Sequence, residues 1–274
     1  MTYFGVLATF ILPPLLVLMV VVPRDVWRRL IRRQGVINWQ PYIIVLVHVV
    51  MALIYTTPWD NYLVATGVWW YNPQLVTGIT MGWVPIEEYT FFVVQTLLSG
   101  LWTLAVIRFG FKVPPDLAPN PTLRRRACIG VGAVWSISTV ILLVGWQPGT
   151  YLTLILSWAL IPVLIQLAFG ADILLANSRP LLAAIVAPTL YLWVIDTLAI
   201  RSGTWSIDPL QTTGLVLIAL PVEEMLFFLM TNVIIACGMT LMLSEASKQR
   251  ARVMLADLKA RVVKGQETRV SHSR

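Results

Sequence analysis

The side chains best suited to chemistry form two glutamate doublets, each placed two residues after a proline and three residues before a pair of phenylalanines. A carboxylic acid beside an aromatic ring can protonate an apolar alkene, and the face of the ring can stabilise the carbocation that forms. The doublets therefore predict acid chemistry on an apolar substrate. The residues of the two motifs are Pro85, Glu87, Glu88, Phe91 and Phe92, and Pro221, Glu223, Glu224, Phe227 and Phe228.

The two acids of a doublet are expected to have different surroundings, because neighbouring residues on an α-helix point about 100° apart. Residues four apart share a face, so we expect Glu87 beside Phe91 and Glu88 beside Phe92, with the same pairing in the second motif. All four glutamates are catalytic candidates, and the phenylalanines are candidates for binding the substrate or stabilising a cation. The residues alone leave open that an acid only hydrogen-bonds neighbouring helices, or that the rings only pack.

Two aspartates stand ahead of the doublets at matching positions. Asp60 lies 27 residues before Glu87, and Asp196 lies 27 residues before Glu223. We interpret both aspartates as candidates for relaying protons or orienting a glutamate. Asp60 is equally compatible with a solvated position at a membrane interface.

The composition places these acids in a membrane protein. Of the 274 residues, 58% are hydrophobic and 12% are charged, whereas about 25% of an ordinary soluble chain is charged. The net charge of +7 comes from residues between long apolar blocks, not from a basic face on a soluble fold, which argues against a nucleic-acid binder. Two cysteines without a CxxC motif, two histidines and no glycine-rich nucleotide motif predict neither a metal site nor a cofactor.

We expect an all-α integral membrane protein, because seven apolar stretches are long enough to cross the hydrocarbon core of a bilayer. The third and seventh stretches are over-long, so each is either strongly tilted or broken near Pro85 or Pro221. The first stretch follows Met1 without basic residues or a small-residue cleavage site, and we interpret it as a retained anchor. The predicted spans are 3–22, 42–59, 75–107, 127–146, 150–169, 181–200 and 213–243.

The distribution of basic residues predicts the orientation. Every lysine and arginine except Arg201 falls after the first, third, fifth or seventh span, which puts the N-terminus outside and the C-terminus in the cytoplasm of a multi-pass protein of the cell membrane. The tail near 244–263 is either an amphipathic surface helix or a solvated terminus. Trp69, Trp70 and Trp205 are expected in outer loops, as parts of an aromatic belt.

These spans would put the glutamates deep in the bilayer. Glu87 lies twelve residues into its predicted span, which corresponds to about 18 Å and is close to the membrane centre. A charge there costs at least about 2.5–3.5 kcal/mol, so we expect at least one acid of each doublet to be protonated near neutral pH. Each proline would also free a backbone carbonyl one turn earlier, on Met81 or Leu217.

The sequence contains an internal repeat. Residues between Asp60 and Phe92 recur 136 positions later, and the ILPPLL run around Pro14 resembles the LIPVLI run around Pro162 at a spacing of 148. We expect two parallel three-span units, because the fourth span between them restores the orientation of the second unit. The predicted divisions are the repeats 1–110 and 150–243, the linker 111–149 with the fourth transmembrane helix, and the basic cytoplasmic tail 244–274.

The doubled PxEE motif on three-span repeats resembles the membrane-integral lycopene cyclase family, in the fused form that joins two small subunits in one chain. The resemblance covers both motifs and both repeats, residues 1–243. It implies cyclisation of the linear ends of lycopene to β-ionone rings, giving γ-carotene and then β-carotene by proton-initiated, non-redox chemistry without a flavin. The positions that the resemblance carries over are Pro85, Glu87 and Glu88, and Pro221, Glu223 and Glu224.

The partners implied are lycopene or a related linear carotenoid and membrane lipid, together with association with other carotenoid-pathway enzymes. The residues leave open which glutamate gives the proton and which removes one. Each repeat could serve one end of the substrate, or both could build a single cavity at their interface, which is the arrangement we favour. The number of rings formed, β or ε closure and the use of longer carotenoids are also left open.

The main alternative is a proton-coupled membrane transporter, for which intramembrane carboxylates are equally suitable. A transporter needs polar groups along a path to both sides, and the spans have few of them away from the glutamates. A metalloprotease would need more histidines than His48 supplies. A retinal-binding protein would need a lysine within a span, and none of the four lysines lies in one.

Overall fold

The computed structural model describes residues 1–24, 39–110 and 117–256. Seven helical stretches in this part of the chain are long and apolar enough to cross a membrane, which confirms the predicted number of spans and the all-α class. Much of the basic loop sequence, at 25–38 and 111–116, and the end of the tail lie outside the described residues. The stretches are Tyr3–Val21, Gln40–Ala65, Ile86–Arg108, Pro121–Val144, Gln147–Ala176, Ser178–Arg201 and Val222–Leu243.

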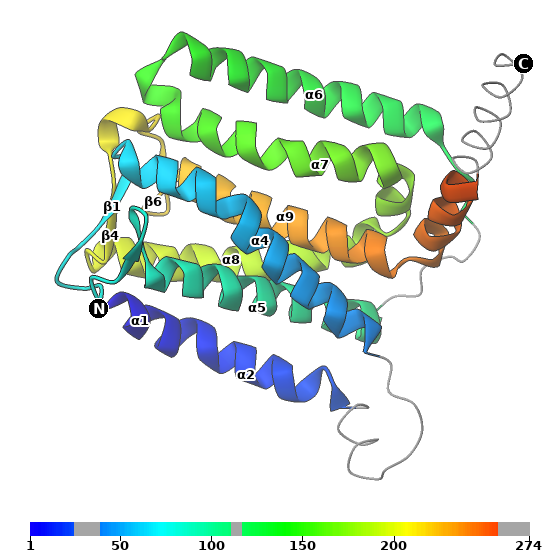
Figure 1. Ribbon diagram of the computed structural model, residues 1–274, viewed down its shortest axis with the longest axis horizontal. Coiled ribbons are helices and arrows are strands. Elements are labelled where there is room, and N and C mark those ends of the chain that lie inside the picture. The colour runs from blue at the N-terminus through cyan, green and yellow to red at the C-terminus, as the bar shows by residue number, and fades with distance from the viewer. Residues whose placement is uncertain (25–38, 111–116, 257–274) are drawn as a thin grey trace, which may run out of the picture.

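Consecutive helices run in opposite directions through one bundle (Figure 1). The first stretch consists of α1 (Tyr3–Val6), a π-helical turn (Leu7–Ile11) and α2 (Leu12–Val21). The N-terminus and the short strands lie at one end of the bundle, and the tail lies at the other. The remaining helices are α4 (Gln40–Ala65), α5 (Ile86–Gly110), α6 (Pro121–Val144), α7 (Thr150–Ala176), α8 (Ser178–Arg201) and α9 (Val222–Leu243).

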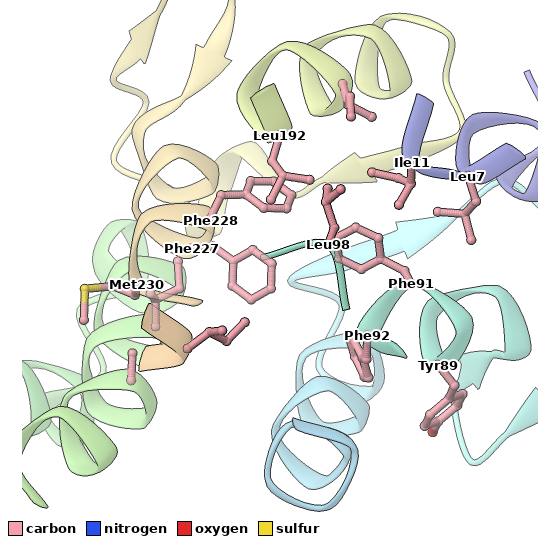
Figure 2. Close-up of a cluster of buried hydrophobic side chains, with 14 of the residues drawn as sticks. Leu7, Ile11, Tyr89, Phe91, Phe92, Leu98, Leu192, Phe227, Phe228 and Met230 are labelled. Carbon is pink, nitrogen blue, oxygen red and sulfur yellow. The ribbon is translucent and has the colours of Figure 1, made fainter. Parts of the chain in front are cut away.

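Helices α5 and α9 form the centre of the bundle. Of the 18 most apolar consecutive residues in each of them, 61% are buried inside the protein. The corresponding share is 6% in α6, which packs against α7 at the edge of the bundle (Figure 1). Phenylalanines from α5 and α9 meet in the core beside Leu7 and Ile11 of the first helical stretch and Leu192 of α8 (Figure 2). The two helices that carry the glutamate doublets are therefore the most enclosed elements of the fold.

The prediction that the third and seventh spans begin near residues 75 and 213 is wrong. Two short hairpins precede the central helices: β2 (Thr80–Met81) pairs with β3 (Val84–Pro85), and β5 (Val216–Leu217) pairs with β6 (Leu220–Pro221). Both central helices begin at the residue after the proline, a place where the missing N–H of proline removes no helical hydrogen bond. The alternative that each stretch is broken at its proline is confirmed.

This start of the helices also corrects the depth of the acids. Glu87 and Glu88 lie in the first turn of α5, and Glu223 and Glu224 lie in the first turn of α9, rather than twelve residues into a helix. The carbonyls of Met81 and Leu217, which each proline was expected to free within a helix, lie in the hairpins instead. The carbonyl of Met81 accepts a hydrogen bond from the Tyr89 hydroxyl at 2.7 Å.

A third small sheet joins segments that are far apart in the sequence. Strand β1 (Trp69–Tyr71) pairs antiparallel with β4 (Trp205–Ile207), so that Tyr71 lies opposite Trp205. Trp69 is buried, and the indole of Trp205 is bonded within the protein, so the expected aromatic belt is wrong for these two residues. Trp70 is exposed, as a belt residue would be.

The tail begins with a helix over residues 245–256, beyond which the chain lies outside the described residues. The guanidinium of Arg250 donates two hydrogen bonds to the buried carboxylate of Asp172 in α7, at 2.9 and 2.7 Å. The backbone N–H of Asn120 donates to the same carboxylate at 2.9 Å. This cluster ties the tail helix and the segment before α6 to the end of α7.

Candidate active site

One small cavity brings together acids from both doublets. It has a volume of about 40 Å³, and its wall is made by the first helical stretch, β1, α5, α8, β4 and α9. Glu88 of α5 and Glu224 of α9 both line it, although they are 136 residues apart in the sequence. The other lining residues that carry polar or aromatic groups are Tyr3, Trp69, Tyr71, Phe91, Asp196, Trp205, Phe227 and Phe228.

Glu88 is held by two tyrosine hydroxyls. Tyr3 at the start of the first helix donates a hydrogen bond to Oε2 of Glu88, and Tyr71 of β1 donates to the same oxygen at 3.1 Å. Burial, together with the negative charge of Glu88, raises the pKa of Tyr71 well above its ordinary value, so this phenol remains a donor. Two donors on one oxygen suit a carboxylate in its ionised form.

Glu224 has a different set of partners. Tyr151 of α7 donates to Oε1 of Glu224 at 2.6 Å. Asp196 of α8 lies within hydrogen-bonding reach of Glu224 and accepts the indole N–H of Trp205 at 2.9 Å through Oδ1. Its other oxygen, Oδ2, is buried and has no donor among the described residues. Two carboxyl groups this close form a hydrogen bond only when one of them carries a proton.

The other acid of each doublet does not line the cavity and instead bonds to the segment that leads into the preceding hairpin. Oε1 of Glu87 accepts the backbone N–H of Thr77 at 2.6 Å. Oε1 of Glu223 accepts both the backbone N–H and the hydroxyl of Thr213, each at 2.7 Å. The prediction that neighbouring glutamates face different directions is thereby confirmed, and the two positions of a doublet have different partners.

Asp60 lies in the interior, so the alternative of a solvated interface residue is wrong. Its side chain is fully buried in α4, and neither carboxylate oxygen has a hydrogen-bond partner among the described residues. It is near enough to Glu88 for their charges to interact. The indole nitrogen of Trp69 is likewise buried without an acceptor in the described part of the chain.

At the cavity, the expected pairing of an acid with the phenylalanine four residues later holds for Glu224 and Phe228 but not for Glu88 and Phe92. Glu88 lines it with Phe91, and Glu224 lines it with Phe227, which are spacings of three residues. Phe228 also reaches the cavity, and its ring meets that of Phe91 edge to face at 6.1 Å (Figure 2). Phe92 does not line the cavity but lines a larger groove next to it.

Several residues of this site escaped the sequence reasoning, although one signal for them was available. The spacing of 148 residues that relates Pro14 to Pro162 also relates Tyr3 to Tyr151. These are the two tyrosines that donate to Glu88 and Glu224. Tyr71 has no counterpart of this kind, because the residue 136 positions later is Ile207.

The described residues offer no obvious place for a metal ion. Within 1–24, 39–110 and 117–256, no three histidine, cysteine, aspartate or glutamate side chains are grouped as metal ligands would be. The cavity wall has few polar groups beyond the acids, their tyrosines and two indoles. What this arrangement can do with its own residues is move a proton next to an apolar, ring-lined space.

Comparison with known proteins identifies relatives that share most of the chain. Residues 1–106 and 148–242 match the family model described as lycopene cyclase. A lycopene beta-cyclase from Halobacterium salinarum is 40% identical over 193 residues, which are 70% of this chain and 78% of the relative. No solved structure matches the chain.

Larger relatives contain the same region as part of a longer protein. A bifunctional lycopene cyclase/phytoene synthase from Sporisorium reilianum is 36% identical over 197 residues, which are 68% of this chain and 28% of the relative. A protein of the same name from Aspergillus oryzae is 35% identical over 196 residues, 70% of this chain and 33% of the relative. The matched segments cover most of the described bundle, and the chain belongs to the lycopene cyclase family.

Proposed function

We propose that this membrane protein converts the linear ends of lycopene to β-ionone rings, giving γ-carotene and then β-carotene. The observation that carries the proposal is the shared cavity, in which Glu88 and Glu224 lie beside aromatic rings and apolar side chains. Ring closure of this kind is an isomerisation, because the proton added to one carbon is balanced by a proton lost from another. No electron donor or acceptor enters the balance.

Glu224 is the acid in this proposal. Glu224 lies close to Asp196, and Oδ2 of Asp196 has no donor among the described residues. One proton held between the two carboxyl groups accounts for both observations. Transfer of that proton to the terminal double bond leaves a carbocation, which the next double bond attacks to close the six-membered ring. Asp196 then shares the negative charge that remains on the carboxyl pair.

Glu88 is the base in this proposal. Its carboxylate accepts hydrogen bonds from Tyr3 and Tyr71, which hold it in one orientation toward the cavity. It removes a proton from the ring carbon next to the cation, and the ring double bond forms. The faces of Phe91 and Phe227 stabilise the positive charge between the two steps.

Glu87 and Glu223 are positioning residues in this proposal. Each ties the segment that leads into its hairpin to the first turn of its helix, by accepting a backbone N–H from Thr77 or Thr213. A fixed hairpin sets the first turn of the helix, and this turn carries the reacting glutamate. Asp60 is proposed to tune Glu88 through its charge.

The proposed architecture consists of the repeats 1–110 and 150–243, joined by the linker 111–149, which contains the fourth transmembrane helix, and followed by the basic tail 244–274. Two observations support it. The hairpin and the acid turn occur twice, each with a threonine backbone N–H donated to the first glutamate of the doublet. The two segments that match the family model, 1–106 and 148–242, begin and end close to the bounds of the repeats. We propose that the end with the strands faces outward and that the tail faces the cytoplasm, because the basic residues gather at the ends of alternate helices. The cell membrane, contact with lipid and association with other carotenoid-pathway enzymes belong to the same proposal.

The test is expression in a lycopene-accumulating host, followed by chromatography of the pigments. Glu88→Gln and Glu224→Gln should lower the rate of ring formation about 10²–10⁴-fold, because each removes a group that transfers a proton. Glu87→Gln and Glu223→Gln are the matched controls. The amide oxygen of glutamine can still accept the threonine N–H, so these variants should stay within about tenfold of wild type.

Two results would count against the proposal. Lycopene left unchanged by the wild-type protein would reject the substrate, and full activity in both cavity variants would reject the acid and base. Reaction in heavy water adds a direct readout of mechanism. Proton-initiated closure must place deuterium on the new ring, and its absence would exclude this route.

A further inference from the structure

A long apolar groove lies beside the acid cavity. It has a volume of about 800 Å³ and lies between α4 and α7, with α5 and α9 forming its floor. Met51 of α4 and Ile165 of α7 line it and are 57% and 67% exposed, so the groove opens sideways to the surroundings of the bundle. In a bilayer these surroundings at this depth are lipid chains.

The groove and the acid cavity share part of their wall. Phe91 of α5 and Phe227 of α9 line both hollows. Figure 2 shows their rings reaching from the two helices toward the same central space. A molecule in the groove is therefore separated from Glu88 and Glu224 only by the layer that contains these rings.

Helices α4 and α7 are fastened together at the end of the groove that is nearer to the acids. The hydroxyl of Tyr55 donates to the carbonyl of Trp158 at 2.8 Å, and the indole of Trp59 donates to the carbonyl of Leu154 at 3.1 Å. The rings of Tyr55 and Trp158 stack at 5.7 Å and line the groove. This end is thus a fixed aromatic wall, whereas the groove continues along the helices toward the tail.

The dimensions suit a single rod-shaped molecule. The groove follows α9 from Phe227 to Leu241, fourteen residues apart, which corresponds to about 21 Å along a helix. This is about two thirds of the roughly 30 Å hydrocarbon thickness of a bilayer. At the far end the groove reaches Lys248 and Ala251 of the tail helix.

We propose that the groove between α4 and α7 binds the polyene chain of the carotenoid, with one end of the molecule passing between Phe91 and Phe227 into the acid cavity. The inference rests on the proposed cyclase function and adds the binding site of the unreacted part of the substrate. A stiff conjugated chain pays little conformational entropy on entering a straight groove. The stacked rings of Tyr55 and Trp158 offer it flat aromatic contact.

The experiment fills the groove without touching the acid cavity. In the double variant Met51→Trp with Ile165→Trp, large side chains enter from opposite walls at positions that are exposed and contact no acid. The matched control is Val50→Trp with Ala168→Trp, on the same two helices at exposed positions outside the groove. Each purified protein is assayed in lipid nanodiscs with lycopene and with a shortened polyene that keeps the linear end group but stops before the Met51–Ile165 level.

The double variant should lose about tenfold or more in kcat/KM for lycopene and stay within about twofold of wild type for the shortened polyene. The control should match wild type on both substrates. Full activity of the double variant on lycopene would overturn the inference and assign the groove to a lipid chain. Equal losses on both substrates would also overturn it, because they would show that the substitutions damage the enzyme regardless of the length of the polyene. Failure of the wild-type protein on both substrates would instead reject the proposed function.

Discussion

Trp205 donates its indole N–H to Asp196, whereas Trp69, which stands 136 positions earlier in the sequence, makes no such bond to Asp60. The nitrogen of Trp69 and both carboxylate oxygens of Asp60 are buried without partners in the described part of the chain. Trp69 packs instead with its ring edge to face against Phe227 at 6.1 Å. Two similar sequence segments therefore give the acid cavity two chemically different sides.

Replacing Trp205 by phenylalanine should impair ring formation more than the same change at Trp69. Trp205→Phe removes the donor that holds Asp196, and a hydrogen bond to a charged group contributes about 1.5–3 kcal/mol. We expect kcat/KM for lycopene to fall about tenfold or more. Trp69→Phe keeps an aromatic ring and loses only an unpaired N–H, so its activity should remain within about threefold of wild type.

Pigment ratios in a lycopene-accumulating host give a first comparison of the two variants, and initial rates in nanodiscs give the quantitative one. Equal losses in both variants would mean that ring packing matters at these positions and that the bond to Asp196 does not.

Tyr71 should make the stability of the protein fall in alkaline solution. Burial and the nearby charge of Glu88 raise the pKa of this phenol in the folded protein above its ordinary value of 10.0. The folded state then holds the proton more tightly than the unfolded chain, so the resulting stability is fully present below pH 10 and is lost as the pH rises through the folded-state pKa. Tyr71→Phe has no such proton to lose.

The measurement is the melting temperature of both proteins in detergent at a series of pH values. The melting temperature of wild type minus that of Tyr71→Phe should be constant up to about pH 9 and decrease above about pH 10. A difference that stays constant across this range would contradict the effect assigned to Tyr71.

The tail helix should detach when Arg250 is replaced. Arg250→Gln leaves the buried carboxylate of Asp172 without its main cation, and breaking a buried ion pair costs about 3–5 kcal/mol. Because this pair holds the helix of residues 245–256 against α7, limited proteolysis should cleave the tail at least about tenfold faster.

Lys248→Gln is the matched control for this change. It removes an ion pair on the same helix, but the partner Glu245 is 72% exposed, and exposed pairs contribute at most about 1 kcal/mol. Cleavage at the wild-type rate in Arg250→Gln would show that other contacts hold the tail.

The sequence predicts those features of the fold that depend on length and local geometry. Seven spans follow from apolar stretches that are long enough to cross a bilayer, and they are present in the structure. The different directions of Glu87 and Glu88 follow from the angle between neighbouring residues on a helix. The hydrogen bonds of Glu87 and Glu88 to different partners agree with that expectation.

The starts of the central helices could not be read from hydropathy, because an apolar hairpin and an apolar helix have similar compositions. Ile79 and Ile218 are 64% and 83% exposed in their hairpins, yet each contributes to an apparently continuous span. Proline alone does not mark the start either, because Pro58, Pro162 and Pro188 lie inside helices of the same bundle. The partners of the acids depend on tertiary packing, which brings Tyr71 and Tyr151 to them from distant elements.

Glu88 and Glu224 line the same cavity, so in the proposed mechanism they act together on one end of a molecule whose two ends are identical. After the first closure the half-finished pigment must back out, turn end for end in the bilayer and re-enter before its second terminus can react. The one-ring compound is then free in the lipid, where another enzyme can bind it. The ratio of one-ring to two-ring pigment then depends on how fast this compound rebinds to the cyclase compared with its capture by other enzymes.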